Sequence, residues 1–165
     1  MTLTTTTERT HGAIMNPTIP IALTESAAGD NNFVPNYGSA GAAGADLRAA
    51  ISEPLILEPG DRRLIPTGVC LAVPQGFEAQ VRSRSGLALR HGLYLPNAPG
   101  TIDSDYRGEV GVILQNGGRE AVTIARGERI AQLVIAPVAQ ADFLLSDGLD
   151  ETVRGDGGFG STGRR

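Results

Sequence analysis

Residues 97–108 read Asn-Ala-Pro-Gly-Thr-Ile-Asp-Ser-Asp-Tyr-Arg-Gly, and this stretch separates two strand-like segments, 93–95 and 110–115. Its Pro-Gly pair, its acidic centre and its closing Arg-Gly pair are residues typical of turns. Two apolar runs joined by such a connection indicate a β-hairpin. The sequence therefore predicts antiparallel β structure here, with Asp103, Asp105 and Tyr106 on the connecting loop.

The same pattern of short apolar segments and turn residues extends outward in both directions. In residues 44–51, Ala45, Leu47 and Ala49 alternate with Asp46 and Arg48, as in a half-buried strand. Further strands are predicted at 19–23, 54–57, 62–73 with a break at Pro66-Thr67-Gly68, 77–83, 122–124 and 132–138. With 22 Gly, 10 Pro and only 4% aromatic residues, the chain favours an all-β sandwich or barrel.

One stretch, residues 85–92, is typical of a short helix. Ser85 is expected to cap its start and Gly92 to end it. This places Arg84 at a helix N-terminus, where backbone amides favour an anion. Residues 82–86, Arg-Ser-Arg-Ser-Gly, fit a phosphate site or a solvated edge equally well.

Composition limits the possible functions. The 165 residues suffice for one domain, and a net charge of −4 gives no basic field for nucleic acid. Cys70 is the only cysteine, which excludes a disulfide framework and predicts a buried thiol; His11 and His91 have no zinc-ligand spacing. No apolar run approaches the roughly 18 residues of a membrane span, and no signal peptide is evident, so we expect a cytoplasmic protein without nucleic-acid or membrane partners.

The two ends differ from the centre. Residues 1–18 are rich in Thr and predict a disordered tail, residues 19–150 a β domain, and residues 151–165 a flexible arm. The arm carries Gly-Gly-Phe-Gly-Ser-Thr-Gly at 157–163, which lacks the lysine and the preceding strand of a Walker A loop. It is either a simple flexible tail or a segment in which Phe159 stacks on a base.

The hairpin loop also allows two interpretations. Acidic turns are usually only solvated. However, Tyr106 follows Asp103 by three residues, which allows a ring beside a carboxylate in a compact turn. One of the two could then support a sugar while the other activates a water molecule.

Five separated blocks, taken together, resemble the motifs of the homotrimeric deoxyuridine triphosphatases (dUTPases). They occur in the family's order within residues 19–163, and they are residues 43–49, 84–88, 97–108, 127–133 and 154–163. The resemblance implies a jelly-roll-like β-barrel or sandwich with one short helix and a flexible C-terminal arm that closes over the active site. It also implies a homotrimer with shared active sites that hydrolyses dUTP to dUMP and pyrophosphate with Mg2+, limiting uracil incorporation into DNA and supplying dUMP for thymidylate synthesis.

The resemblance assigns roles to matching residues. Asp103 becomes the general base for the attacking water, Tyr106 packs under the deoxyribose, and Asp46 contacts Mg2+ through water, the metal being held mainly by substrate phosphates. The uracil is read by Asn97 and by the backbone around Gly100, Thr101, Ile102 and Gly111. The phosphates are held by Arg84, Ser85 and Gly86 of a neighbouring subunit and by Gln132. The arm contributes Arg154, Phe159, Gly160, Ser161 and Thr162.

Two alternatives compete with the plain hydrolase. A related deoxycytidine triphosphate deaminase shares the fold, and the arm with Phe159 argues against it. A non-catalytic nucleotide-sensing trimer is expected to lack Asp103 or the arm, and this chain has both. The chain departs from the family pattern at Ser83, often proline, at Gly148 and in its Thr-rich leader.

Overall fold

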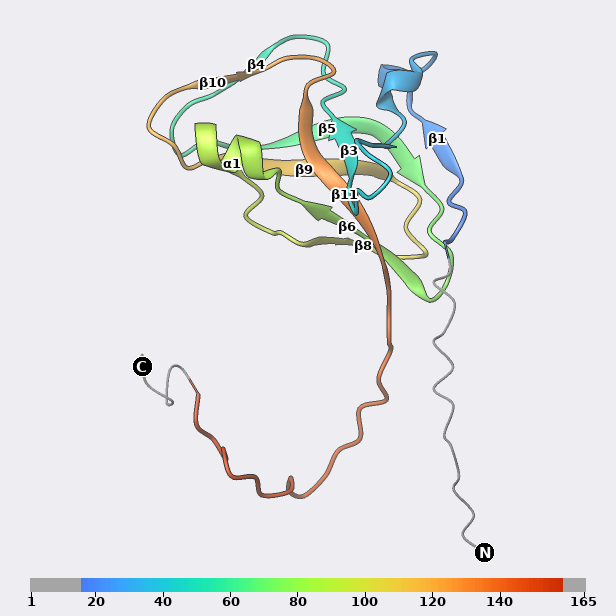
Figure 1. Ribbon diagram of the computed structural model, residues 1–165, viewed down its shortest axis with the longest axis vertical. Helices are drawn as coiled ribbons and strands as arrows, with labels where there is room; N and C mark the ends of the chain where they lie inside the picture. The colour runs from blue at the N-terminus through green and yellow to red at the C-terminus, as the bar shows by residue number, and fades with distance from the viewer. Residues whose placement is uncertain (1–15, 159–165) are drawn as a thin grey trace, which may run out of the picture.

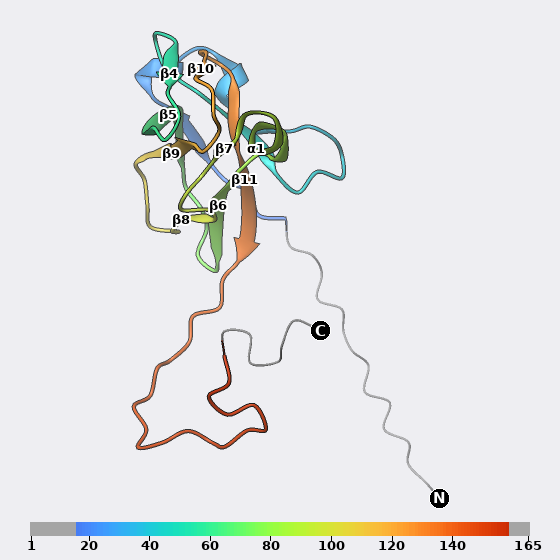
Figure 2. The ribbon, with the colours of Figure 1, turned by 90° about the vertical axis from the view of Figure 1, so that its left-hand side faces the viewer.

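Two β-sheets and the core between them make up the body of the protein. The computed structural model describes residues 16–158, which contain eleven strands, one α-helix and two short 3₁₀ helices. One sheet has the order β1-β5-β9-β7, the second β2-β3-β11-β6-β8, and β10 pairs with β4. These described strands form a jelly-roll-like β structure and do not close into a barrel (Figures 1 and 2).

The strands and helices have the following bounds. They are β1 (Ile21–Leu23), η1 (Glu25–Ala27), η2 (Asn31–Phe33), β2 (Asn36–Tyr37), β3 (Ala45–Arg48), β4 (Leu55–Leu57), β5 (Arg62–Leu71), β6 (Phe77–Arg82), α1 (Ser85–His91), β7 (Leu93–Tyr94), β8 (Gly100–Ile102), β9 (Glu109–Asn116), β10 (Val122–Ile124) and β11 (Arg129–Pro137).

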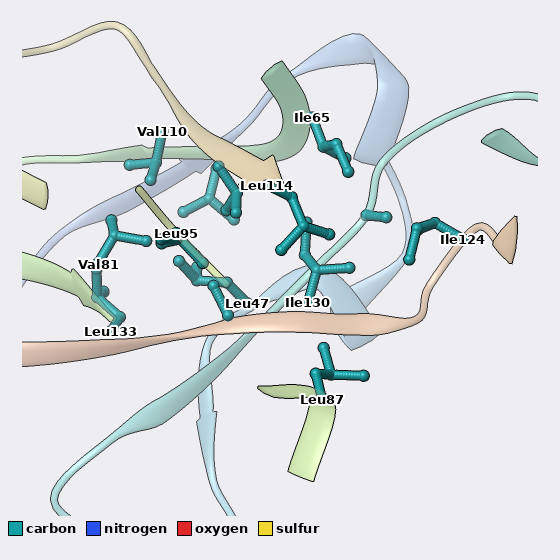
Figure 3. Packing of buried hydrophobic residues seen from close by; sticks show 14 of the residues in the cluster. Leu47, Ile65, Val81, Leu87, Leu95, Val110, Leu114, Ile124, Ile130 and Leu133 are labelled. Carbon is teal, nitrogen blue, oxygen red and sulfur yellow. The ribbon is translucent and has the colours of Figure 1, made fainter. Parts of the chain in front are cut away.

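Alternation of apolar and polar residues decides which side of each strand faces the core. Every second residue of β9 is buried, including Val110 and Leu114, and these meet Leu47 of β3 and Leu133 of β11 from the other sheet (Figure 3). The predicted alternation in β3 is confirmed, because Leu47 is buried while Asp46 is half-buried on the opposite side. Asp46 is therefore on the outer face of the five-stranded sheet.

The predicted hairpin exists, but its loop also contributes to the second sheet. Strands β7 and β9 pair antiparallel, with Leu93 opposite Asn116. Between them, β8 pairs with β6 of the five-stranded sheet. The sequence did not predict β8 because it has only three residues and its partner is distant along the chain.

The predicted break in the 62–73 segment is a bulge within a single strand. The register of β5 against β9 shifts between Pro66 and Cys70, and Gly68 has a positive φ of 72°. The Thr67 hydroxyl donates to the Val110 carbonyl over 2.6 Å. Cys70 is half-buried, so the expectation of a buried core thiol is wrong.

Helix α1 begins as predicted, but without the predicted cap. Arg84 is the N-cap residue, has extended backbone and makes no side-chain cap, while Ser85 is already helical; the prediction that Ser85 caps the helix is wrong. The end is as predicted, with Gly92 in the left-handed conformation and its amide bonded to Ala88. Arg84 thus directly precedes the first helical turn.

Beyond β11 the chain leaves the two sheets. Residues 139–158 run away from the β domain (Figures 1 and 2) and contain no strand. Residues 1–15 of the predicted tail, 1–18, lie outside the described residues. The predicted arm residues Phe159, Gly160, Ser161 and Thr162 also lie outside them. Within residues 16–158, no helix is long and apolar enough to cross a membrane.

Candidate active site

A row of polar residues crosses the outer face of the five-stranded sheet. In the sheet register, Gln132 of β11 lies opposite both Asp46 of β3 and Arg82 of β6. The next row, with Leu133 opposite Ala45 and Val81, is buried in the core. The pleat of the sheet therefore presents Asp46 and Gln132 side by side on the surface.

A bulge in β11 brings Arg129 to the same face. The register against β3 shifts between Arg129 and Ala131, so Arg129 lies opposite Arg48 and Ala131 opposite Leu47. In a regular strand, residues three apart point to opposite faces. The extra residue, Ile130, allows Arg129 and Gln132 to face outward together.

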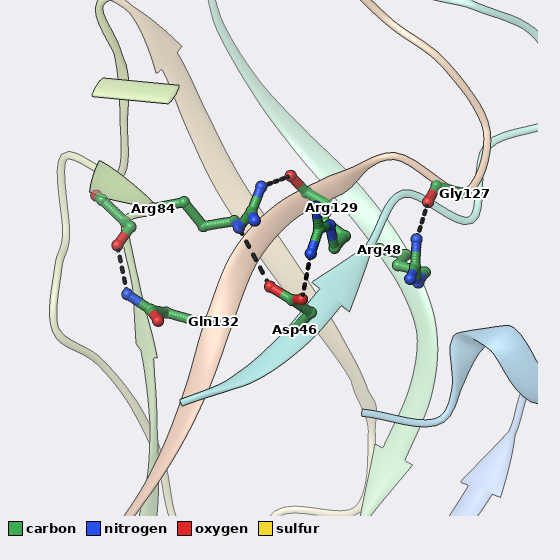
Figure 4. Close-up of polar contacts among 7 residues, drawn as sticks. Asp46, Arg48, Arg84, Gly127, Arg129 and Gln132 are labelled. Carbon is green, nitrogen blue, oxygen red and sulfur yellow. Dashed lines mark hydrogen bonds and ion pairs between the residues drawn. The ribbon is translucent and has the colours of Figure 1, made fainter. Parts of the chain in front are cut away.

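These residues form an ion-pair cluster around Asp46 (Figure 4). The Asp46 carboxylate lies 3.2 Å from Nε of Arg84 and 3.1 Å from Nη1 of Arg129. Nη1 of Arg84 also donates to the main-chain oxygen of Arg129 over 3.1 Å. Two guanidinium groups against one carboxylate leave the cluster with a surplus positive charge, which favours an anionic ligand.

Gln132 ties this cluster to the segment before the helix. Its Nε2 donates to the Ser83 carbonyl over 3.0 Å (Figure 4). A Cβ on Gly44 would approach Oε1 of Gln132 to 2.6 Å, so the glycine leaves room for this side chain. Ser85 and Gly86 follow in the first turn of α1, with Ser85 exposed. The predicted phosphate residues Arg84, Ser85, Gly86 and Gln132 are thus brought together.

The hairpin loop forms a second, separate group. The Tyr106 hydroxyl donates to the Glu109 carbonyl over 2.9 Å, and its amide donates to the Asp103 carbonyl over 3.2 Å. Nη1 of Arg107 donates to the Ser104 and Tyr106 carbonyls, both at 2.7 Å. This compact turn leaves the Asp103 side chain exposed, on a surface hollow that Thr101 also lines.

The predicted uracil-reading residues lie along β8 and at the start of β9. A Cβ on Gly100 would come within 2.9 Å of Nδ2 of Asn97, so the Asn97 amide lies against this glycine. Gly111 is half-buried, and a Cβ there would meet Cδ1 of Leu64 at 2.6 Å. Both positions therefore exclude a larger residue unless a neighbouring side chain moves.

The two groups lie near opposite ends of β6. Because Ile102 pairs with Ala79, Asp103 is level with Glu78 at the start of the strand, whereas Arg84 follows its end. Arg84 follows Glu78 by six residues, and at about 3.3 Å per residue along an extended chain their Cα atoms are at most roughly 20 Å apart. The Asp103 carboxylate and the Arg84 guanidinium therefore belong to two separate regions of the chain's surface.

The arm stands apart from both groups. Arg154 is exposed and its Nε donates to the Gly157 carbonyl over 2.7 Å. The other predicted arm residues, Phe159, Gly160, Ser161 and Thr162, lie outside the described part of the chain. Within residues 16–158, no group of three or more His, Cys, Asp or Glu side chains could hold a metal.

The residue that sequence reasoning missed in this region is Arg129. It lies within the block 127–133, but a regular strand would have placed it on the face opposite Gln132. A signal was present in Ile130-Ala131, two consecutive apolar residues that are both fully buried, as expected at a bulge.

The chain is similar to known proteins in both sequence and fold. The dUTPase family model matches residues 30–163. Deoxyuridine 5'-triphosphate nucleotidohydrolases from Anaeromyxobacter sp. (strain Fw109-5) and Roseobacter denitrificans are each 63% identical over 131 residues, which is 79% of this chain and 88% and 86% of theirs. The Staphylococcus bacteriophage 80alpha dUTPase solved with dUpNHpp is 26% identical with a TM-score of 0.78, covering 90% of this chain and 99% of its own. The chain belongs to the dUTPase family.

Proposed function

We propose that this protein hydrolyses dUTP to dUMP and pyrophosphate by attack of water on the α-phosphorus. The family match over residues 30–163 is the observation that carries this proposal. The geometry supports it, because the chain has an exposed carboxylate on a compact hairpin and a cluster with surplus positive charge beside a helix start. The reaction would limit uracil incorporation into DNA and supply dUMP for thymidylate synthesis.

The reaction needs one proton acceptor and good neutralisation of charge. Asp103 accepts a proton from water as the water oxygen bonds to the α-phosphorus. The bond from that phosphorus to the oxygen bridging to the β-phosphate breaks, and pyrophosphate leaves with its electron pair. Displacement at phosphorus depends mainly on positioning and electrostatics, which Arg84, Gln132 and the amides of Ser85 and Gly86 supply.

Selection of the nucleoside belongs to the hairpin. Asn97 and the backbone of residues 100–102 bond the polar edge of uracil, and Gly111 borders the base. Tyr106, fixed by its bond to Glu109, lies under the deoxyribose and leaves no room for a 2′-hydroxyl. Thymine and ribonucleotides are then rejected mainly by steric exclusion.

Magnesium enters with the substrate in this proposal. Within residues 16–158 there is no preformed cluster of acidic ligands, while Asp46 offers one partly exposed carboxylate beside Arg84. This arrangement fits Mg2+ bound through substrate phosphates, with Asp46 touching one of its water molecules. When bound, the metal supplies charge neutralisation on the phosphates.

The active site is completed between copies of the chain, in a homotrimer. The separation of Asp103 from Arg84 along β6, up to roughly 20 Å in one copy, supports a site in which a second copy supplies one of the two groups. The arm supports this as well, because Phe143, Leu144 and Leu145 are 89–104% exposed in the single chain. Apolar side chains grouped in this way are usually covered by a partner, and Arg154 with residues 159–162 would then close over a site formed with other copies.

Pyrophosphate release from dUTP, dTTP, dCTP and UTP in the presence of Mg2+ tests the proposal. We expect dUTP to be hydrolysed with kcat/KM at least about 100-fold above the other three, because each contact that excludes a group contributes a factor of ten or more. Comparable turnover of UTP would contradict the role given to Tyr106. Ammonia release from dCTP would identify a deaminase instead.

A further inference from the structure

Arg129 makes two different contacts with the phosphate cluster. Its side-chain Nη1 holds the Asp46 carboxylate at 3.1 Å, and its main-chain oxygen accepts from Nη1 of Arg84 at 3.1 Å. Asp46 in turn holds Nε of Arg84 at 3.2 Å. Both anchors of the Arg84 guanidinium therefore depend on Arg129, one directly and one through Asp46.

Two anchors on different nitrogens fix the plane of a guanidinium group. An unrestrained arginine side chain loses rotamer entropy when a ligand orders it, and this loss lowers the affinity. In this protein the Arg84 side chain is ordered when the chain folds, before any ligand binds. The bulge in β11 and the pairing of β3 with β11 fix the positions of Asp46 and of the Arg129 main-chain oxygen, which hold the Arg84 guanidinium. The Arg84 side chain remains 26% exposed, so a phosphate can still reach it.

We infer that Arg129 is a positioning residue, which holds Arg84 through Asp46 in the orientation that receives the substrate phosphates. This inference rests on the proposed function and adds a residue to it. The side chain of Arg129 does not touch the substrate in this account. Its contribution must therefore disappear when Asp46 no longer carries a charge.

A double-mutant cycle on binding tests this without turnover or metal. The probe is dUpNHpp, measured by calorimetry without Mg2+ on the full-length wild type, Arg129→Met, Asp46→Asn and the double variant. Arg129→Met is expected to weaken binding about ten-fold, as loss of an orienting partner of a ligand-binding group typically does. In the Asp46→Asn background the same change should alter the dissociation constant less than about two-fold.

Two further variants separate positioning from general stability. Arg129→Lys keeps the charge and should recover most of the affinity. Arg63→Met removes an exposed arginine of β5 that lies 3.6 Å from Asp61 and far along the chain from the cluster, and this change should leave binding unchanged. Thermal unfolding of each variant shows whether any loss merely reflects a less stable fold.

Each remaining outcome decides against the inference. An equal loss of affinity in both backgrounds would mean that Arg129 contacts the phosphates itself, and no loss in either would mean that it positions nothing. If the wild type binds dUpNHpp but the cycle shows no coupling, only this inference is overturned. If the wild type binds dUpNHpp only in the presence of Mg2+, the cycle is measured with Mg2+. If it binds dUpNHpp neither without Mg2+ nor with it, the proposed function falls and the inference with it.

Discussion

The hairpin with Asp103 and the cluster around Asp46 lie near opposite ends of β6 and are built in opposite ways. The hairpin is held by contacts within a few residues, such as the bond from the Tyr106 hydroxyl to Glu109. The cluster is held by contacts across 83 residues between Asp46 and Arg129 and 49 between Ser83 and Gln132. The hairpin therefore needs only its own turn to form, whereas the cluster around Asp46 requires the complete five-stranded sheet.

The largest effect is expected from the hairpin carboxylate. Asp103→Asn keeps the size of the side chain but removes the proton acceptor, so kcat should fall on the order of 10³-fold. Pyrophosphate release measures this, with thermal unfolding as the check on the fold. Asp105→Asn, in the same exposed turn, is the matched control and should keep most of the activity. The reverse ranking of these two variants would contradict the assignment of the base.

A chain ending at Asp156 tests the role of the C-terminal arm, which is part of neither the hairpin nor the cluster around Asp46. Turnover should fall on the order of 10²-fold, as expected when phosphate donors are lost and water enters the site. The midpoint of thermal unfolding should change little, because residues 139–158 pair with no strand. Removing residues 1–15 instead is the control and should leave turnover unchanged. A truncated chain with full activity would remove the arm from the mechanism.

Gly100→Ala sharpens the role of the hairpin in reading the base. The new Cβ would lie only 2.9 Å from Nδ2 of Asn97 and would push this amide aside. Because the amide is the end of a side chain, it can move without unfolding the turn. We expect KM for dUTP to rise about ten-fold, the value of one good hydrogen bond, with little change in kcat. Gly41→Ala, where a Cβ meets nothing within 4 Å, is the control. An unchanged KM would argue against Asn97 as a reader.

The smallest effect concerns stability away from both groups. Arg126 lies 4.8 Å from the centre of the Phe33 ring and donates to the Ile51 carbonyl over 3.2 Å. Its Nη2 also donates to the Ser26 carbonyl over 2.6 Å. Arg126→Met should lower the free energy of unfolding by about 1–2 kcal/mol, because it removes one cation–π contact and two hydrogen bonds from an exposed side chain. Urea unfolding measures this, and exposed Arg119→Met is the control. A loss of turnover per folded protein would show that this region acts on the site.

The sequence predicted what depends on neighbours along the chain. The alternation in 44–51, the hairpin strands around residues 93 and 110, and the helix end at Gly92 all follow from local patterns, and the structure confirms them. The all-β class follows in the same way. The resemblance of the five blocks then gave the family, which the comparisons confirm.

The sequence did not reveal what depends on partners far away. Strand β8 needs β6, and Arg129 joins the cluster only because the bulge at Ile130 changes its face. The prediction of Ser85 as the N-cap was wrong because residue types alone do not show which residue is the last one with extended backbone. In the structure this residue is Arg84, and Ser85 is already helical. The distance along β6 between Asp103 and Arg84 likewise required the register of three strands.

Mixing two inactive chains tests the central claim, that copies of the chain share each active site. Asp103→Asn chains lack the base and Arg84→Gln chains lack the phosphate cation, so each alone should be nearly inactive. If each site takes its hairpin from one copy and its arginine from another, an equal mixture assembled from unfolded chains should regain about a quarter of wild-type turnover, because random assembly gives one intact combination in four. A mixture no more active than its parents would show that each chain acts alone and would contradict the account.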